Sequence, residues 1–473
     1  MTDEDAGTSE PATCTFTPDE LNAPQGLFDT DPTHVRCSRP VWEGTDSDRC
    51  VWHAEHDNKP AMELLATIGD GELIGARAQK TDFTEHSFPW GLDLQDADFT
   101  NASLKGADFT DMDLRRADLT NADLRDVTLT KVHLWGATLA DADLRRADLT
   151  DATLRNADLV RANLGDADLT DSELRDVILT GANLRGAILN NVDLSDADLT
   201  GAILRDADLI NTSLREVDLT DTDLREADLT GAILRDADLT DADLRGAILT
   251  DADLRGAILT DADLRGAILT DADLREADLT DADLRGAILI NANLNEAKLP
   301  GVTLSRGTQC DDLPGLRETA TAADDSATGW DNVARSYHAL KMAFAANGLV
   351  GRARDYHVLE QDAREREAEA TEGRLSQAYL SSKASRYLTG YGVRPIRVGL
   401  LMVLLFGIAT VVYLLDPGIE NSLSYSVVTF TTSPPGGKLP VHPIAQGIAL
   451  VETFVGTLLI VLLGYVLGNR ERF

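Results

Sequence analysis

A five-residue period runs from Gly91 to Ser305 and holds for 43 consecutive pentapeptides. Its fourth position is leucine except at Phe99 and Phe109, and its second position is mostly alanine. A period of five fits neither a helix, at 3.6 residues per turn, nor a strand, at two. The apolar residues can all face one axis only if the chain turns a corner every five residues, so that four sides make a coil of about twenty residues. One coil cannot bury its leucines alone, whereas stacked coils can.

The pentapeptides ADLTD, ADLRG and ANLRG resemble A(D/N)LXX, the consensus of the pentapeptide-repeat family. This resemblance covers residues 91–305 and implies a right-handed quadrilateral β-helix, with about eleven coils stacked over roughly 50 Å at the spacing of strands. Some members of the family mimic DNA with an acidic rod and bind topoisomerase. Arginines interrupt the acidic surface here, so we do not expect this chain to act in that way, and we predict no nucleic-acid partner.

The register of the repeat also predicts what the outer faces carry. Residues twenty apart lie above one another, so Ile248, Ile268 and Ile288 form one column, with Ile188 further along the same face. An outward apolar column predicts a docking surface for a protein partner, and isoleucines scattered on the surface are the alternative. The recurring DADLR permits ladders of charge pairs.

The composition is strongly acidic, with a formal net charge of -37 and only 8 lysines against 35 arginines. Such a surface is typical of proteins adapted to concentrated salt, where the repulsion between like charges is screened. The N-terminus MTDEDAGTSE has no apolar core, so it does not resemble a secretory signal. No nucleophile with a neighbouring base, phosphate-binding loop or paired carboxylates stands out, and we predict that the chain is not an enzyme.

Residues 1–60 contain three of the four cysteines in the spacing C-x22-C-x12-C-x2-H. Three thiolates and one imidazole complete a closed tetrahedral zinc site, which is structural rather than catalytic. The predicted ligands are Cys14, Cys37, Cys50 and His53, with His56 as an alternative fourth ligand and unliganded thiols as the alternative to a site.

Composition divides the rest of the chain. Residues 61–90 are a transition and cap before the repeat, and residues 306–330 are a linker. Residues 331–390 show apolar positions at spacings of three and four, which predicts two helices broken at the GLVG segment around Gly348.

Residues 391–473 contain two segments long enough to cross a membrane. Val398 to Leu415 has no charge, and Ile444 to Leu467 has one, at Glu452. Arginines flank the outer ends of both segments, whereas the loop between them has only Lys438. The excess of positive charge on the cytoplasmic side predicts a protein of the cell membrane with two spans and both termini in the cytoplasm.

The loop at 419–440, between the two segments, resembles the pore loop of two-span potassium channels. SVVTFTT matches the end of the pore helix of that family, and Thr432 and Gly436 stand at matching positions. The family filter reads TVGYG, whereas Ser433, Pro434 and Pro435 fill its centre here. Proline fixes φ, so rings of stacked carbonyls are not expected and potassium selectivity is in doubt. The predicted pore-loop residues are Thr431, Thr432, Ser433, Pro434, Pro435, Gly436 and Gly437.

One pore loop per chain cannot enclose a pore, so this resemblance implies a homotetramer in membrane lipid. We therefore expect a channel-like membrane protein whose cytoplasmic coil senses, assembles or gates. The alternative is a membrane-anchored scaffold for protein interactions with a pore that does not conduct. Glu452 is costly inside a membrane unless it faces protein or water, and it serves either as a structural partner of a loop hydroxyl or backbone amide or in permeation.

Overall fold

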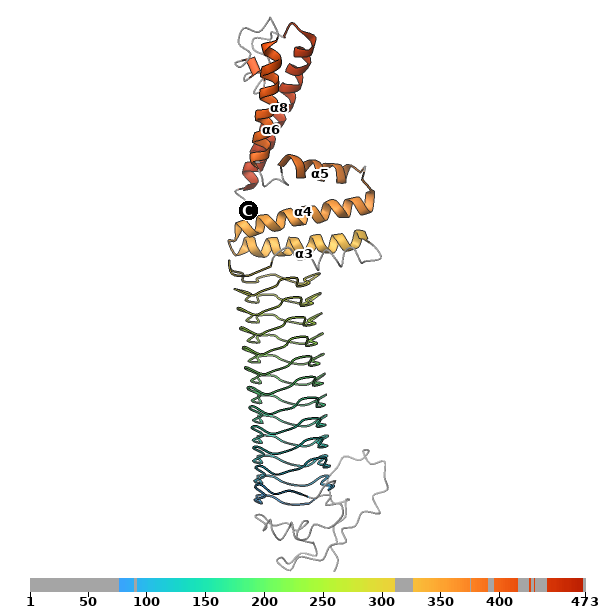
Figure 1. Cartoon of the computed structure of the whole chain (residues 1–473), viewed down its shortest axis with the longest axis vertical. Coiled ribbons are helices and arrows are strands. Elements are labelled where there is room, and N and C mark those ends of the chain that lie inside the picture. Colours follow the sequence, from blue (N-terminus) through green and yellow to red (C-terminus); the bar gives the residue numbers. More distant parts are fainter. Residues whose placement is uncertain are drawn as a thin grey trace, which may run out of the picture. The chain divides into compact units, whose positions relative to one another are not determined.

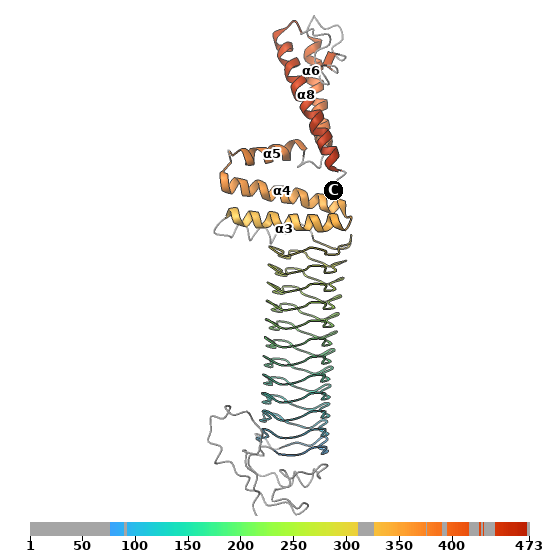
Figure 2. The same cartoon turned by 180° about the vertical axis from the view of Figure 1, so that it is seen from behind.

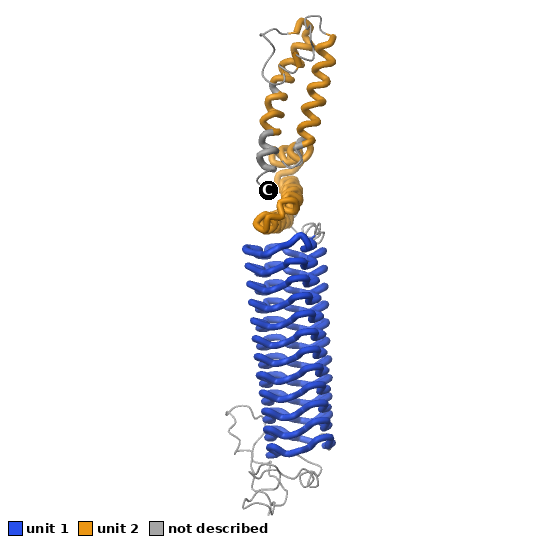
Figure 3. The backbone as a smooth tube through the Cα atoms, turned by 90° about the vertical axis from the view of Figure 1, so that its left-hand side faces the viewer, with its two compact units in different colours: residues 1–313 blue, residues 314–473 orange. Residues whose placement is uncertain are grey.

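The structure is a computed structural model that describes residues 76–88, 92–310, 326–374, 376–389, 395–415, 425–426, 429 and 440–470. The chain divides into two compact units, residues 1–313 and residues 314–473 (Figure 3). The first unit contains a stacked coil, and the described residues of the second unit include five helices (Figure 1).

Each side of the coil contributes one residue to a parallel bridge with the coils before and after it. Asp238, for example, bridges Asp218 and Ile258, twenty residues away on either side. The N–H of Leu239 donates to the carbonyl of Ile258 at 2.7 Å, and this pattern recurs along the coil. Bridges of single residues take the place of longer strands in the described part of the coil, because two of every five residues are needed to turn the corner. The expected solenoid of four-sided coils is thus observed.

The corners explain which residues occupy the first position of the repeat. At one corner the N–H of Ala242 donates to the carbonyl of Leu239 at 3.1 Å, and Asp241 between them has a φ of 58°. Aspartate, asparagine and glycine fill most of the equivalent positions. These are the residues that enter the left-handed region at the lowest cost.

The core of the coil is built from the two inward positions. Leu239 and Ala237 are completely buried, as are nearly all of their equivalents. Phenylalanines fill the axis in the first coils, where the rings of Phe88 and Phe109 stack at 4.7 Å and those of Phe99 and Phe109 meet edge to face at 6.2 Å. Each buried leucine contributes about 2 kcal/mol through the area it removes from water.

The coil extends beyond residues 91–305 at both ends. Bridges begin at Arg77, within the predicted transition, and the last one joins Ile288 to Gln309, within the predicted linker. Six residues rather than five separate Ser87 from Asp93, so the first bridges span 21 residues. This extra residue and Phe83 in place of leucine conceal the first sides from a search for the period.

The second unit begins with a helical hairpin. Helix α3, Ser326–Ala346, packs along α4, Val350–Glu372. Gly348 between them has a φ of 69°, and the N–H of Leu349 donates back to the carbonyl of Phe344 at 2.9 Å, which ends α3. The rings of Phe344 and Tyr356 stack at 5.3 Å between the two helices.

A third helix, α5, Gln377–Thr389, follows the hairpin, so residues 331–390 contain one helix more than the pattern predicted. It packs against α4, where Arg386 pairs with Asp362 at 2.7 Å. It also contacts the next helix, α6, Pro395–Leu414.

Helices α6 and α8, Pro443–Arg470, form an antiparallel pair. Val398 near the start of α6 packs on Leu459, whereas Ala409 and Tyr413 near its end pack on Ala445 and Ala449 at the start of α8. The alanines let the two backbones approach closely. The helices include apolar stretches of 19 residues (Ile396–Leu414) and 21 residues (Pro443–Leu463), each long enough to cross a membrane.

Candidate functional site

A buried carboxylate lies between α6 and α8. Glu452 on α8 is 0% exposed, and its Oε2 accepts a hydrogen bond from the hydroxyl of Tyr413 on α6 at 2.7 Å. Its Oε1 accepts a hydrogen bond from the hydroxyl of Ser426, which lies in the chain between the two helices. One side chain of α8 therefore joins α6 to the intervening segment.

That intervening segment is helical where it is described. Tyr425, Ser426 and Thr429 have helical conformations, and Ser426 and Thr429 are fully buried. The ring of Tyr425 meets the ring of Tyr413 edge to face at 5.0 Å. The hydroxyl of Ser426 also lies 3.5 Å from the carbonyl oxygen of Phe406. The hydroxyl oxygen of Thr429 is buried without a hydrogen-bond partner among the described residues.

Among the residues that the structure describes, no lysine, arginine or histidine pairs with Glu452. A charged carboxylate between apolar helices is costly, and two hydroxyl donors offset only part of that cost. In the described part of the chain, the side chains that donate to Glu452 are these two hydroxyls. Glu452 therefore links α8 to Tyr413 of α6 and to Ser426 of the intervening segment.

The other residues predicted to form sites lie outside the described part of the chain. These are the pore-loop residues Thr431 to Gly437 and the zinc ligands Cys14, Cys37, Cys50 and His53. The fourth cysteine, Cys310, is buried at the end of the coil.

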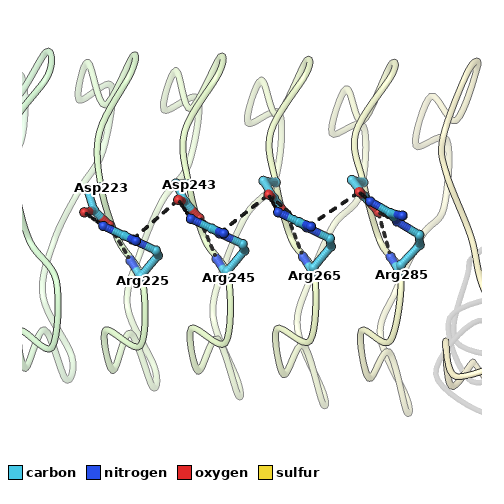
Figure 4. Close-up of polar contacts among 8 residues, drawn as sticks. Asp223, Arg225, Asp243, Arg245, Arg265 and Arg285 are labelled. Carbon is cyan, nitrogen blue, oxygen red and sulfur yellow. Dashed lines mark hydrogen bonds and ion pairs between the residues drawn. The ribbon is translucent and has the colours of Figure 1, made fainter.

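One outer face of the coil carries a continuous ladder of charges (Figure 4). Arg245 forms a bidentate pair with Asp243 on its own coil, at 2.7 and 2.5 Å, and its Nε lies 3.6 Å from Asp263 on the next coil. The same contacts repeat from Asp223 to Arg285. These arginines are about 34 to 49% exposed, so each pair stabilises the coil only slightly.

A second face carries the predicted apolar column. Ile248, Ile268 and Ile288 are joined by consecutive bridges, which confirms that they lie above one another. All three are partly exposed, and Ile188 on the same face is 38% exposed. The outer surface of the coil therefore presents a regular apolar column and a regular charge ladder on different faces.

The helical hairpin contains a buried charge cluster that the sequence pattern did not reveal. Glu360 on α4 accepts hydrogen bonds from Lys341 at 2.7 Å and from His338 at 2.9 Å, both on α3. Burial alone would raise the pKa of Glu360, but the neighbouring His357, Lys341 and His338 outweigh burial and lower the pKa to about 2. The His357 ring nitrogen is more distant than the other two donors, at 3.8 Å. The cluster holds the two helices of the hairpin together.

The expectation that a loop hydroxyl is a partner of Glu452 is confirmed by Ser426, whereas its other partner, Tyr413, and the partners of Glu360 were not predicted from the sequence. Tyr413 could have been predicted as a partner of Glu452, because it carries a hydroxyl within the uncharged segment Val398 to Leu415. The cluster around Glu360 could have been predicted from Lys341, which stands among apolar residues in a helix, where an unpaired charge would not be tolerated.

Segments between residues 93 and 306 match the family described as pentapeptide repeats, in 8 copies. No curated protein matches the chain significantly. No enzyme family is indicated by these matches.

Solved structures of pentapeptide-repeat proteins are similar to the coil. HetL, involved in heterocyst differentiation regulation in the cyanobacterium Nostoc, is 33% identical over 50% of this chain and 88% of its own, with a TM-score of 0.28. A protein from the thylakoid lumen of Arabidopsis thaliana is 32% identical over 24% of this chain and 79% of its own, with a TM-score of 0.22. QnrB1, a plasmid-mediated fluoroquinolone resistance protein, is 18% identical over 49% of this chain and 94% of its own, with a TM-score of 0.17.

Proposed function

This chain belongs to the pentapeptide-repeat family, and from that premise we propose that it is a membrane-anchored interaction protein. In this proposal the coil, a right-handed quadrilateral β-helix, presents its faces to a protein partner, and α6 and α8 hold it in a bilayer. The coil suits such a role because its outer faces repeat at a fixed spacing, so that they offer a long, rigid surface.

The observation that carries the proposal is the exposed apolar surface of α6 and α8. Val403 and Leu404 on α6 are 67 and 63% exposed, and Leu458 and Val461 on α8 are 55 and 64% exposed. The core helices of a soluble protein bury such residues, whereas helices that cross a membrane direct them at lipid. The flanking arginines favour an orientation with both termini in the cytoplasm.

Extraction of membranes with alkaline carbonate tests the anchorage. We expect the full chain to stay with the membranes and to be released only by detergent. A variant with Leu404→Arg and Leu458→Arg should partition less into membranes, whereas a variant with Ile248→Arg and Ile268→Arg on the coil should behave like the parent. Release of the parent chain by carbonate would contradict the proposal.

A second candidate function is a pore formed by four chains. This hypothesis is favoured by the helical conformation of Tyr425, Ser426 and Thr429, which stand between α6 and α8 in the sequence, and by the hydrogen bond from Ser426 to Glu452. In this hypothesis Pro434 and Pro435 replace the carbonyl filter with a stiffer mouth, which conducts with little preference for potassium or does not conduct.

The first test is the oligomeric state, obtained by mass measurement in detergent, because a monomer would contradict the pore hypothesis. If a tetramer forms, ion flux in vesicles should show no strong preference for potassium over sodium. Replacing Ser433-Pro434-Pro435 by Val-Gly-Tyr should raise that preference. High selectivity for potassium in the unaltered chain would contradict the argument from proline.

For the N-terminal region we propose a structural zinc ion bound by Cys14, Cys37, Cys50 and His53. The support is the ligand set, whose thiolates and imidazole suit tetrahedral zinc. Metal analysis of the purified chain should find one zinc per chain, lost in a Cys50→Ser variant and kept in a Cys310→Ser variant. Absence of zinc, or full retention in Cys50→Ser, would reject the site.

A further inference from the structure

Helix α5 carries an apolar stripe that no described residue covers. Leu380 and Tyr387 are 50 and 69% exposed, and they stand seven residues apart with the exposed Ala384 between them. Residues at these spacings lie on one face of a helix. The stripe of Leu380, Ala384 and Tyr387 is therefore a continuous apolar surface.

A different face of α5 is fixed on the hairpin. Tyr379 is buried, Arg386 pairs with Asp362 of α4 at 2.7 Å, and Lys383 lies 3.9 Å from Glu365 of α4. These contacts turn the stripe away from α4. They also occupy the basic residues of α5 with carboxylates of the same chain.

The orientation of α5 relative to α6 determines what lies beside the stripe. Both views show α5 lying across the axes of α6 and α8, beside the first turns of α6 (Figures 1 and 2). The guanidinium of Arg397 on α6 donates to the carbonyl of Arg386 at 2.9 Å, which ties the end of α5 to the start of α6. Ile396 and Leu400 on α6 are 72 and 63% exposed, so the first turns of α6 also present apolar surface.

We propose that α5 is an interfacial helix whose stripe lies in the boundary between headgroups and acyl chains of the bilayer that α6 crosses. This inference rests on the proposed membrane anchorage. A helix that lies across a spanning helix runs in the plane of the membrane, where leucine enters the acyl region and tyrosine keeps its hydroxyl among the headgroups. Because Lys383 and Arg386 are paired with α4, the attraction is apolar, and it does not depend on anionic lipid.

Quenching of tryptophan fluorescence by brominated phosphatidylcholine tests the depth of α5 in full-length chain reconstituted into liposomes. Tyr387→Trp places the fluorophore on the stripe, and Leu380→Trp is a second position on it. Ala378→Trp is a matched control on the exposed face opposite the stripe, and Leu404→Trp is a control on α6. The signal of the five native tryptophans is measured on the parent chain and subtracted.

We expect bromine near the headgroup to quench Tyr387→Trp and Leu380→Trp strongly and Ala378→Trp weakly, equally in zwitterionic and anionic liposomes. Bromine near the chain ends should quench Leu404→Trp. Quenching at the two stripe positions no greater than at Ala378→Trp, with Leu404→Trp quenched, would overturn this inference and leave the anchorage intact. If Leu404→Trp is not quenched either, the proposed anchorage fails and this inference fails with it.

Discussion

The coil and the helical unit are stabilised in opposite ways. In the central coils the backbone hydrogen bonds of one residue recur at its equivalent twenty residues away, so the bonds of Leu239 are repeated at Leu259. In the helical unit the decisive contacts occur once, as at Glu360 in the hairpin and Glu452 between α6 and α8. Loss of one contact in the coil leaves the neighbouring coils intact, whereas loss of one contact in the helical unit removes the link between two elements. Substitutions in the two units therefore test this difference.

The largest effect is expected from Leu249→Asp, which puts an unpaired charge on the axis of the coil, where Leu249 is completely buried. We expect a loss of about 3–5 kcal/mol in the free energy of unfolding. Ile248→Asp is the matched control, because the neighbouring side chain points outward and should cost no more than about 1 kcal/mol. Equal effects of the two substitutions in thermal unfolding would show that the inward and outward positions are assigned wrongly.

The next largest effect is expected from Glu360→Gln in the hairpin. It removes the only charged partner that the described contacts give to the buried Lys341, which should destabilise the hairpin by about 2–3 kcal/mol. Circular dichroism of the full chain during thermal unfolding measures the loss. Glu372→Gln, at the exposed end of the same helix, should have no measurable effect.

The same cluster predicts how the hairpin responds to acid. The pKa of Glu360 is lowered from 4.5 to about 2 on folding, so its contribution is fully present above pH 4.5 and is lost as the pH falls toward 2. After allowance for solvent screening, we expect a loss of about 1–2 kcal/mol across this window. Glu360→Gln should remove this part of the acid sensitivity. An unchanged pH profile in that variant would contradict the role given to the carboxylate.

A smaller effect is expected from Glu452→Ala, which leaves the hydroxyls of Tyr413 and Ser426 without their acceptor. We expect a cost of about 1–2 kcal/mol and faster hydrogen exchange in the segment around Ser426. Glu452→Gln keeps an acceptor oxygen and should fall between the alanine variant and the parent. If exchange around Ser426 is unchanged in Glu452→Ala, the carboxylate does not hold that segment.

The smallest effect is expected from Arg265→Gln, which interrupts the charge ladder at one coil. Exposed ion pairs contribute about 0–1 kcal/mol, and less in concentrated salt. The melting temperature should therefore change little at low salt and not at all at high salt. A large effect that persists in salt would mean that the ladder stabilises the coil as a cooperative network.

The comparison also explains how much could be predicted from the sequence. The fold of the coil could be predicted from local pattern, because whether Leu249 or Ile248 faces the axis or the solvent depends only on its place in the pentapeptide. The twenty-residue register is then sufficient to align Ile268 with Ile288. The partners of Glu452 stand 39 and 26 residues away, and nothing periodic connects them. The ends of the coil also escaped prediction, because one extra residue before Asp93 and another between Thr303 and Gln309 shift the register.

The central claim is that α6 and α8 meet lipid while the coil does not. Photolabelling of the full chain in liposomes with a diazirine probe dissolved in the acyl region tests this most directly. We predict label on α6 and α8, including Leu404 and Leu458, and none on the coil, even at the partly exposed Ile248, Ile268 and Ile288. Label on these isoleucines, or unlabelled α6 and α8, would contradict the claim.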